Sequence, residues 1–164
     1  MGTTVLKRKK REYPTIYMMV GIPYSEKEEI AKRLTAEFYP VVFGDKNLPR
    51  NALSIFEREA PKLDTHEKVC AYINKEAYKA LKTGREVLIK SELTSTEEFR
   101  NLMLKGLIDR YRTVAVYADT PLDICESRMK RARLEETVDL TKLKQELEAP
   151  KQTEGYDDIN HVCK

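Results

Sequence analysis

The chain has 164 residues, a hydrophobic fraction of 41% and a formal net charge of +3 at pH 7. This length is enough for one domain with a core of ordinary size, and no apolar run of roughly 18 residues is present to predict a membrane span. The small positive charge hints at anionic partners, but it does not distinguish a nucleotide, a nucleic acid or neither.

Apolar patterning predicts a chain in which strands and helices alternate. The run TIYMMV at 15–20 is rich in strand formers and continuous, which is typical of a strand buried on both faces of a parallel sheet. Helices are indicated by apolar residues at helical spacing, by Gly84 as a C-terminal cap and by Pro121 in a first turn. In chain order the predicted elements are strand 15–20, helix 25–37, strand 41–43, helix 50–60, helix 65–81, strand 87–89, helix 95–110, strand 114–118, helix 121–133, helix 139–148 and strand 159–162.

This order predicts an α/β fold of three layers, with a five-stranded parallel sheet between helices. Residues 14–164 form the domain, and residues 1–13 form a basic flexible tail that holds the run Lys7-Arg8-Lys9-Lys10-Arg11. The tail is either a solvated extension or a nucleic-acid-binding arm. The lack of interleaved aromatic residues favours the solvated extension.

Cysteine and histidine usage suggests a reducing, cytoplasmic location. Cys70, Cys125 and Cys163 are odd in number and scattered, which suits neither a disulfide framework nor a zinc motif. His66 and His161 are too few and too far apart in sequence for a metal site or a histidine relay to be expected. The basic N-terminus has no apolar stretch beside it, so we expect no signal peptide.

The turn after the first strand is where an open parallel sheet binds its ligand. It reads GIPYSEKEE at 21–29, and the P-loop pattern is G-x-x-x-x-G-K-[ST] between a strand and a helix. Gly21 and Lys27 fit the first glycine and the lysine at the correct spacing. Glu26 stands in place of the second glycine, and Glu28 stands in place of the hydroxyl that binds magnesium.

These changes disfavour a phosphate ligand, because a P-loop presents backbone N–H groups and a helix N-terminus to the phosphates. Glu26, Glu28 and Glu29 add three negative charges there. A carboxylate about 5 Å from one phosphate charge costs about 3 kcal/mol at an effective dielectric constant near 20. The same acids also suit a helix start, since Ser25 with Glu28 has the form of a capping box, as Thr94 has with Glu97.

Three segments carry a resemblance to a known family. MMVGIPYSEKEEIAKRL resembles MxxGxPGSGKSTxAxxL, the opening of the predicted P-loop kinases of the AAA type that are related to the 5′-kinase domain of polynucleotide kinase. ADTPLDICESRMKRAR resembles the segment after their fourth strand, and LEAPKQTEGYDDINHV resembles their ending FExPxxxEGFDxIxxV. The match covers roughly residues 14–162. It implies a P-loop NTPase (kinase-like) fold and transfer of the ATP γ-phosphate, with Mg²⁺, to a hydroxyl acceptor.

The resemblance assigns site residues position by position. Gly21, Ser25 and Lys27 match the loop and would bind the nucleotide, with Glu28 as the candidate metal ligand. Asp45 matches the family's acceptor-binding aspartate, or else it is a turn residue beside Gly44. Arg128, Arg131 and Arg133 lie where the family's lid arginines contact phosphates, or else they form an ordinary exposed helix face.

The family's general base is missing from the segment after the third strand. The family has D-A-T-N-L-T there, whereas this chain reads Ile89-Lys90-Ser91-Glu92-Leu93-Thr94. Ile89 or Lys90 takes the place of the aspartate, and a charged lysine cannot accept the proton. Glu92 either substitutes as the base, with Lys27 as its catalytic partner, or is a solvated residue before the next helix.

The sequence therefore leaves three functions open. It favours a degenerate P-loop kinase-fold protein, a pseudokinase that has lost or weakened ATP binding and acts through contacts with a protein or nucleic acid. The alternative is an active ATP-dependent phosphotransferase that uses Glu28 and Glu92 on a nucleoside, a polynucleotide 5′-hydroxyl or another small hydroxyl acceptor. A third possibility is a nucleic-acid-binding module built from the tail and the arginines.

Overall fold

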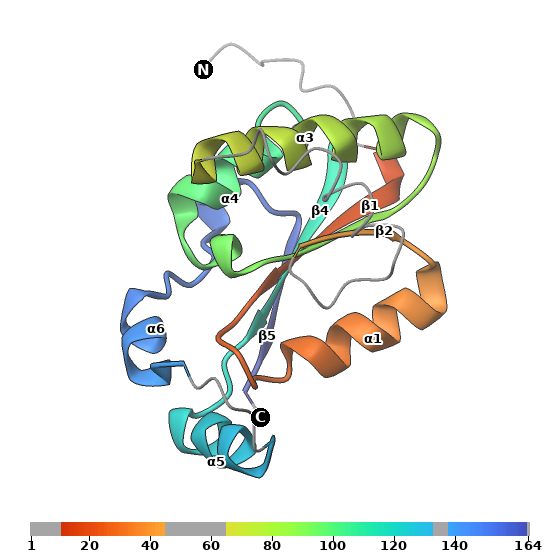
Figure 1. Cartoon of the computed structure of the whole chain (residues 1–164). Helices are drawn as coiled ribbons and strands as arrows, with labels where there is room; N and C mark the ends of the chain where they lie inside the picture. The colour runs from red at the N-terminus through yellow and green to blue at the C-terminus, as the bar shows by residue number, and fades with distance from the viewer. Residues whose placement is uncertain (1–10, 45–64, 133–137, 164) are drawn as a thin grey trace, which may run out of the picture.

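A computed structural model describes residues 11–44, 65–132 and 138–163. Five strands form one sheet in the order β2-β3-β1-β4-β5, and every neighbouring pair is parallel (Figure 1). This confirms the predicted α/β class and five-stranded parallel sheet. The strands are β1 (Arg11–Val20), β2 (Val41–Gly44), β3 (Val87–Lys90), β4 (Tyr111–Ala118) and β5 (Asp158–Val162).

Helices cover both faces of the sheet, and two more lie beyond the carboxyl ends of the strands. Figure 1 shows α3 and α4 on one face, α1 on the other, and α5 and α6 at the end of the sheet where β1 finishes. None of the described helices is both long and apolar enough to cross a membrane. The helices are α1 (Lys27–Phe38), α3 (His66–Lys82), α4 (Glu97–Leu104), α5 (Leu122–Ala132) and α6 (Leu140–Glu146).

Strand β1 explains why the apolar run at 15–20 is continuous. Ile16, Met18 and Val20 face the core under α3 and α4, whereas Tyr17 and Met19 face the core under α1. Alternate residues of a strand point to opposite faces, so a central strand with helices on both sides needs apolar residues at every position. The strand is longer than predicted, because residues 11–13, which we expected in the tail, belong to it.

Several predicted helix boundaries differ from the observed ones, and the end of α4 differs most. The helix expected to reach 110 ends at Leu104, and the chain then turns through Gly106 at a φ of +77°. Asn74 of α3 explains the early end, since its side-chain amide donates to the carbonyls of Met103 (2.8 Å) and Lys105 (2.9 Å), oxygens that would otherwise serve the helix. Helix α1 begins at Lys27 and not at Ser25. The predicted helix 50–60 lies outside the described residues, as do residues 1–10.

Neither predicted capping box forms. The N-cap of α1 is Glu26, which makes no side-chain cap hydrogen bond, and the carboxylate of Glu28 binds Lys90. Thr94 lies in a short 3₁₀ helix (Glu92–Ser95), and its hydroxyl donates to the carbonyls of Met19 (2.6 Å) and Ser91. Glu28 and Thr94 instead bind partners on neighbouring strands, Lys90 of β3 and the Met19 carbonyl of β1. Local sequence does not reveal such partners.

A buried carboxyl group at the amino-terminal edge of the sheet makes the stability of the fold depend on pH. Glu86 is 5% exposed, and its Oε2 has no hydrogen-bond partner among the described residues. Burial raises the pKa of Glu86 above its ordinary value of 4.5, although hydrogen bonds from Tyr17 and the Thr15 amide and the charge of Arg112 act in the other direction. Burial and the nearby Glu86 likewise raise the pKa of Tyr17 to about 12.

Because the folded pKa of Glu86 is raised, its favourable contribution is present below pH 4.5 and is lost as the pH rises through the folded pKa. We therefore expect Glu86→Gln, which resembles the protonated acid, to raise the free energy of unfolding at pH 7 and to flatten its fall above pH 4.5. Urea-induced unfolding at a series of pH values from 4.5 to 7 measures the free energy of unfolding of both proteins. Glu146→Gln removes an exposed carboxylate of α6 and should leave the profile unchanged. A steeper fall in Glu86→Gln than in the unmodified chain would contradict the assignment.

Candidate functional site

The loop between β1 and α1 begins at a glycine that packing requires. A Cβ atom on Gly21 would lie 2.8 Å from Ser25 Oγ and 3.1 Å from the carbonyl oxygen of Ala118. Lys27 is 4% exposed, and its Nζ donates to the Gly21 carbonyl at 3.0 Å, across the loop. Gly21, Ser25 and Lys27, which match the P-loop pattern, therefore lie together at the carboxyl end of the central strand.

Tyr24 is the residue of this loop with an unusual backbone conformation. Its φ is +67°, in the left-handed region that non-glycine residues seldom adopt, and the family pattern has glycine at this position. The Tyr24 side chain packs on the small cluster of Ile22, Cys125 and Leu140, which holds α5 and α6 against the loop. Glu26, by contrast, has an ordinary helical φ of −65°. Tyr24 was not among the predicted site residues, although its alignment with a glycine of the pattern was a usable signal.

Backbone amides of the loop are bound by other groups of the chain. The Glu26 N–H donates to the hydroxyl of Thr120 at 3.0 Å, and Thr120 is fully buried. The Lys27 N–H donates to Ser25 Oγ at 3.3 Å, and the Ser25 N–H donates to the Ile22 carbonyl at 3.2 Å. These N–H groups belong to the stretch that cradles phosphates in a P-loop, and here each has an acceptor within the chain.

An arginine of α5 binds the first acid of the loop. Arg128 Nη2 lies 2.6 Å from Glu26 Oε1, and Arg128 Nη1 donates to the Tyr24 carbonyl at 2.9 Å. Both side chains are half-buried. Arg128 therefore does not lie on a freely exposed helix face. Arg131 does, since it is exposed and its guanidinium contacts Ser127 of the same helix at 3.4 Å.

A lysine at the end of β3 binds the second acid. Lys90 Nζ lies 2.6 Å from Glu28 Oε2, with the Lys90 side chain 11% exposed and that of Glu28 48% exposed. The pairing follows from the sheet, because β3 neighbours β1 and Lys90 aligns with Met19 at the carboxyl end of both strands. Lys90 is one of the two residues, with Ile89, predicted to stand at the aspartate of the kinase pattern, and Glu28 stands at its hydroxyl position, so an altered loop position and this segment are in direct contact.

These contacts change the electrostatics expected from the sequence. Two of the three acids of the loop are each neutralised by a cation at 2.6 Å, so the loop does not present bare carboxylates. Glu29 is exposed and lies 3.8 Å from Lys32 one turn on. Glu92 is exposed in the first turn of the 3₁₀ helix. Asp45 and Arg133 lie outside the described residues, so their predicted roles stay predictions.

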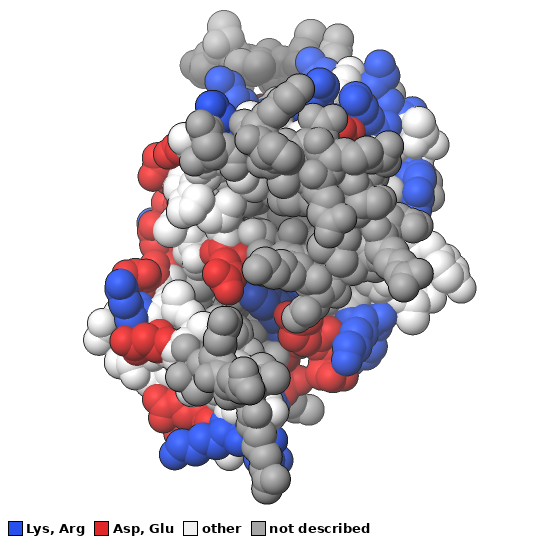
Figure 2. All heavy atoms as spheres, in the orientation of Figure 1, with Lys and Arg blue, Asp and Glu red and all other residues white. Residues whose placement is uncertain are grey.

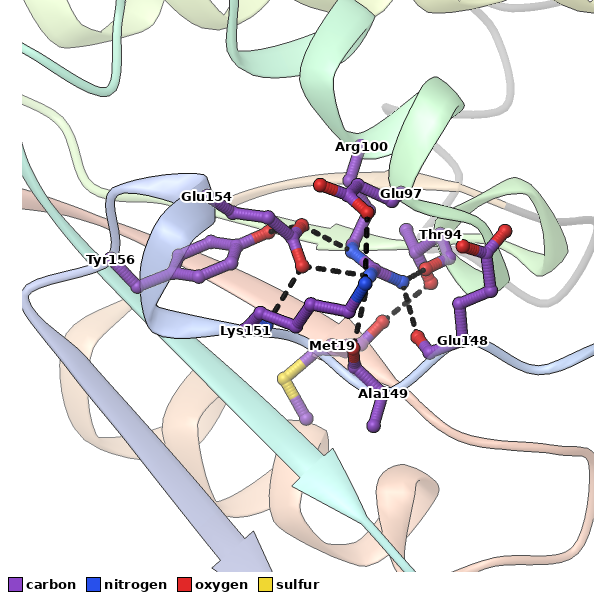
Figure 3. Close-up of polar contacts among 9 residues, drawn as sticks. All are labelled: Met19, Thr94, Glu97, Arg100, Glu148, Ala149, Lys151, Glu154 and Tyr156. Carbon is purple, nitrogen blue, oxygen red and sulfur yellow. Dashed lines mark hydrogen bonds and ion pairs between the residues drawn. The ribbon is translucent and has the colours of Figure 1, made fainter.

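A buried ion pair anchors the segments around this edge of the sheet (Figure 3). Arg100 of α4 and Glu154 of the C-terminal segment form a two-pronged pair, with Nε–Oε1 at 2.9 Å and Nη2–Oε2 at 3.0 Å, and both side chains are fully buried. Arg100 Nη1 also donates to the carbonyls of Thr94 and Glu148, each at 2.8 Å. The motif at 148–156, noted as a family signature, thus has a structural role in joining the C-terminal segment to α4.

A search of protein-family models finds no match to this chain, and a search of curated proteins finds none. Solved structures match through their fold. A sugar kinase from Janibacter sp. HTCC2649 aligns with a TM-score of 0.55 at 15% identity, over 94% of this chain and 85% of that chain. A gluconokinase from Sinorhizobium meliloti 1021 aligns with a TM-score of 0.54 at 16% identity, over 93% and 84%.

A chain in the structure of the Pnkp1/Rnl/Hen1 RNA repair complex also aligns, with a TM-score of 0.57 at 14% identity. The alignment covers 85% of the present chain but only 45% of that larger one. Identities this low show the fold alone. The chain has the α/β fold of P-loop kinases, with an all-parallel sheet of five strands.

Proposed function

We propose that this chain is a P-loop kinase-fold protein that has lost ATP-driven phosphoryl transfer and acts through contacts with another macromolecule. One observation carries the proposal: Glu26–Arg128 and Glu28–Lys90, both at 2.6 Å, place ion pairs of the protein itself at the phosphate loop. Catalysis of phosphoryl transfer consists almost entirely of positioning and electrostatic stabilisation. A site whose charges are already paired with each other supplies little of either.

The residues present do not fit a magnesium–triphosphate complex. A metal ion brought to Glu28 would meet the Lys90 ammonium 2.6 Å from Oε2, and the positive charge of that ammonium repels the ion. A phosphate seated on the loop would compete with Ser25 Oγ and Thr120 Oγ1 for the amides of residues 26 and 27. It would also have to draw Arg128 away from Glu26 and the Tyr24 carbonyl.

Among the residues that the structure describes, the site also lacks a general base at the expected position. Either Ile89 or Lys90 stands where the family has its aspartate; an isoleucine side chain carries no base, and an ammonium bound to a carboxylate has no lone pair with which to accept a proton. Glu92, the remaining acid of this segment, is exposed and belongs to the next turn of the chain. Loss of the base accords with loss of the metal-binding hydroxyl, since a kinase needs both.

An active phosphotransferase is the second candidate, and retention of Lys27 favours it. The lysine is buried, and its Nζ lies across the loop beside the Gly21 carbonyl, in the loop where a P-loop lysine reaches the phosphates. In this case ATP and Mg²⁺ are the cofactors and Glu28 holds the metal. The acceptor is then a nucleoside, a polynucleotide 5′-hydroxyl or another small hydroxyl compound.

Calorimetric titration of the full chain with Mg-ATP separates these candidates. We expect no saturable binding up to several millimolar ATP, that is, a binding free energy weaker than about −4 kcal/mol. Tight binding together with magnesium-dependent ATP turnover that Lys27→Ala abolishes would reject the proposal and establish the phosphotransferase.

The partner is a protein or a nucleic acid, and the described surface around the phosphate loop gives no strong electrostatic preference. Figure 2 shows positive and negative side chains interspersed around α1, α5 and α6 on this face, without a one-sign patch among the described residues there. A nucleic-acid partner would rely on the basic run at 7–11. With such a partner we expect salt-sensitive binding to single-stranded RNA that is lost when residues 1–10 are removed. Binding that survives this removal would show that the tail is not the RNA-binding segment.

A further inference from the structure

Three side chains able to bind a metal meet at the carboxyl ends of β4 and β5. Asp119 directly follows β4, His161 is the penultimate residue of β5, and Cys163 directly follows β5. One ligand atom from each lies within 4.8 Å of the others. The sheet brings the three side chains together. The Asp119 N–H donates to the Val162 carbonyl at 2.7 Å, so the hydrogen bonding between β4 and β5 continues past the ends of the strands.

The positions of these residues in the ladder explain why all three share one side. His161 and Cys163 are two residues apart on an extended chain, so their side chains point to the same face. Tyr117 pairs with His161 in the register, and the two rings stack with centroids 5.0 Å apart at an interplanar angle of 19°. The imidazole is therefore held in place by the sheet before any ion arrives.

We propose that Asp119, His161 and Cys163 form a binding site for a transition-metal ion of the zinc class. Imidazole nitrogen, thiolate sulfur and carboxylate oxygen are the donor types that Zn²⁺ accepts, and three protein ligands leave a fourth tetrahedral position for water or a partner's side chain. The thiolate disfavours Mg²⁺ and Ca²⁺, which prefer oxygen ligands. The 42 residues that separate Asp119 from His161 explain why sequence spacing gave no sign of a zinc motif.

The present geometry is close to the one that the metal would need. His161 Nε2 lies 3.0 Å from Asp119 Oδ2. Tetrahedral coordination with metal–ligand distances near 2.1 Å sets the nitrogen and oxygen about 3.4 Å apart. The ion would replace the hydrogen bond between these two atoms after they move apart by a few tenths of an ångström. The Cys163 sulfur, which lies within 4.8 Å of both, would approach by at most about 1.2 Å.

A lysine competes for the same carboxylate. Lys144 of α6 lies with its Nζ 2.9 Å from Asp119 Oδ1 and 3.4 Å from the Thr120 carbonyl. Its ammonium repels an incoming cation and occupies the second oxygen of the ligand. Removing this charge should therefore tighten metal binding, an effect that no purely structural role of the three ligands predicts.

The test uses the full chain with its thiols reduced, titrated with Zn²⁺ by calorimetry and with Co²⁺ by absorption spectroscopy. We expect one equivalent of Co²⁺ to produce a thiolate-to-cobalt charge-transfer band. Cys163→Ser should abolish that band, and both Cys163→Ser and His161→Ala should weaken Zn²⁺ binding at least tenfold. Lys144→Met should strengthen it severalfold. His66→Ala, which removes the histidine of α3, is the matched control and should leave binding unchanged.

Circular dichroism of each variant confirms that it is folded. Zn²⁺ binding that Cys163→Ser and His161→Ala leave intact would overturn the site. Absence of the cobalt band from both the unmodified chain and Lys144→Met would overturn it as well, since the second protein has no competing ammonium. None of these measurements involves ATP, so their outcome does not depend on whether the phosphate loop binds a nucleotide.

Discussion

Replacing Glu154 by alanine is expected to lower the free energy of unfolding by about 3–5 kcal/mol, because it leaves the Arg100 guanidinium buried without its counter-charge. Both side chains are fully buried, and two hydrogen bonds of 2.9 and 3.0 Å join them. The two carbonyl partners of Arg100 Nη1 remain, but a carbonyl dipole does not replace a negative charge. Urea-induced unfolding followed by circular dichroism measures the loss.

The matched control is Glu97→Ala, which removes a carboxylate from the neighbouring pair with Lys151. That pair is 3.5 Å long and its side chains are 31% and 60% exposed, so we expect a change below about 1 kcal/mol. A double variant, Arg100→Met with Glu154→Leu, removes both charges and should recover much of the stability lost by Glu154→Ala. Equal losses in Glu154→Ala and Glu97→Ala would show that burial of the charge is not what matters.

Restoring the loop with Glu26→Gly and Glu28→Ser is expected to raise the affinity for Mg-ATP at least about tenfold, or about 1.4 kcal/mol. The double substitution removes the carboxylates that hold Arg128 and Lys90, so both cations become able to face phosphate oxygens. It also returns a hydroxyl to the position that holds magnesium in a P-loop. Calorimetric titration of the variant beside the unmodified chain, which should show no saturable binding, gives a lower limit to the difference.

A control of equal charge keeps this result interpretable. Glu29→Ser with Glu37→Ser removes two exposed acids from the same helix and changes the net charge by the same amount. Affinity that rises equally in both double variants would mean that overall charge, and not the two ion pairs, governs nucleotide binding. A rise confined to the loop variant supports the proposed role of the pairs.

The sheet could be predicted from sequence because its inner strands β1, β3 and β4 carry buried apolar residues on both faces. TIYMMV reads as a central strand without knowledge of its neighbours, and the loop that follows it is placed by chain order alone. The spacing of the P-loop pattern likewise revealed that Glu26 and Glu28 replace its second glycine and its hydroxyl. Helix ends were less predictable, since Asn74 reaches from another helix to end α4.

Only the tertiary structure decided which side chains meet at the carboxyl edge of the sheet. Lys90 is 62 residues from its partner Glu28, and Arg128 is 102 residues from its partner Glu26. The Thr94 hydroxyl donates a hydrogen bond to the carbonyl of Met19, 75 residues away. Parallel strands are joined by long crossovers, so residues far apart in the chain end side by side at one edge. Local propensity acts over a few residues, whereas an ion pair or hydrogen bond at that edge forms with whichever partner the strand order brings within reach.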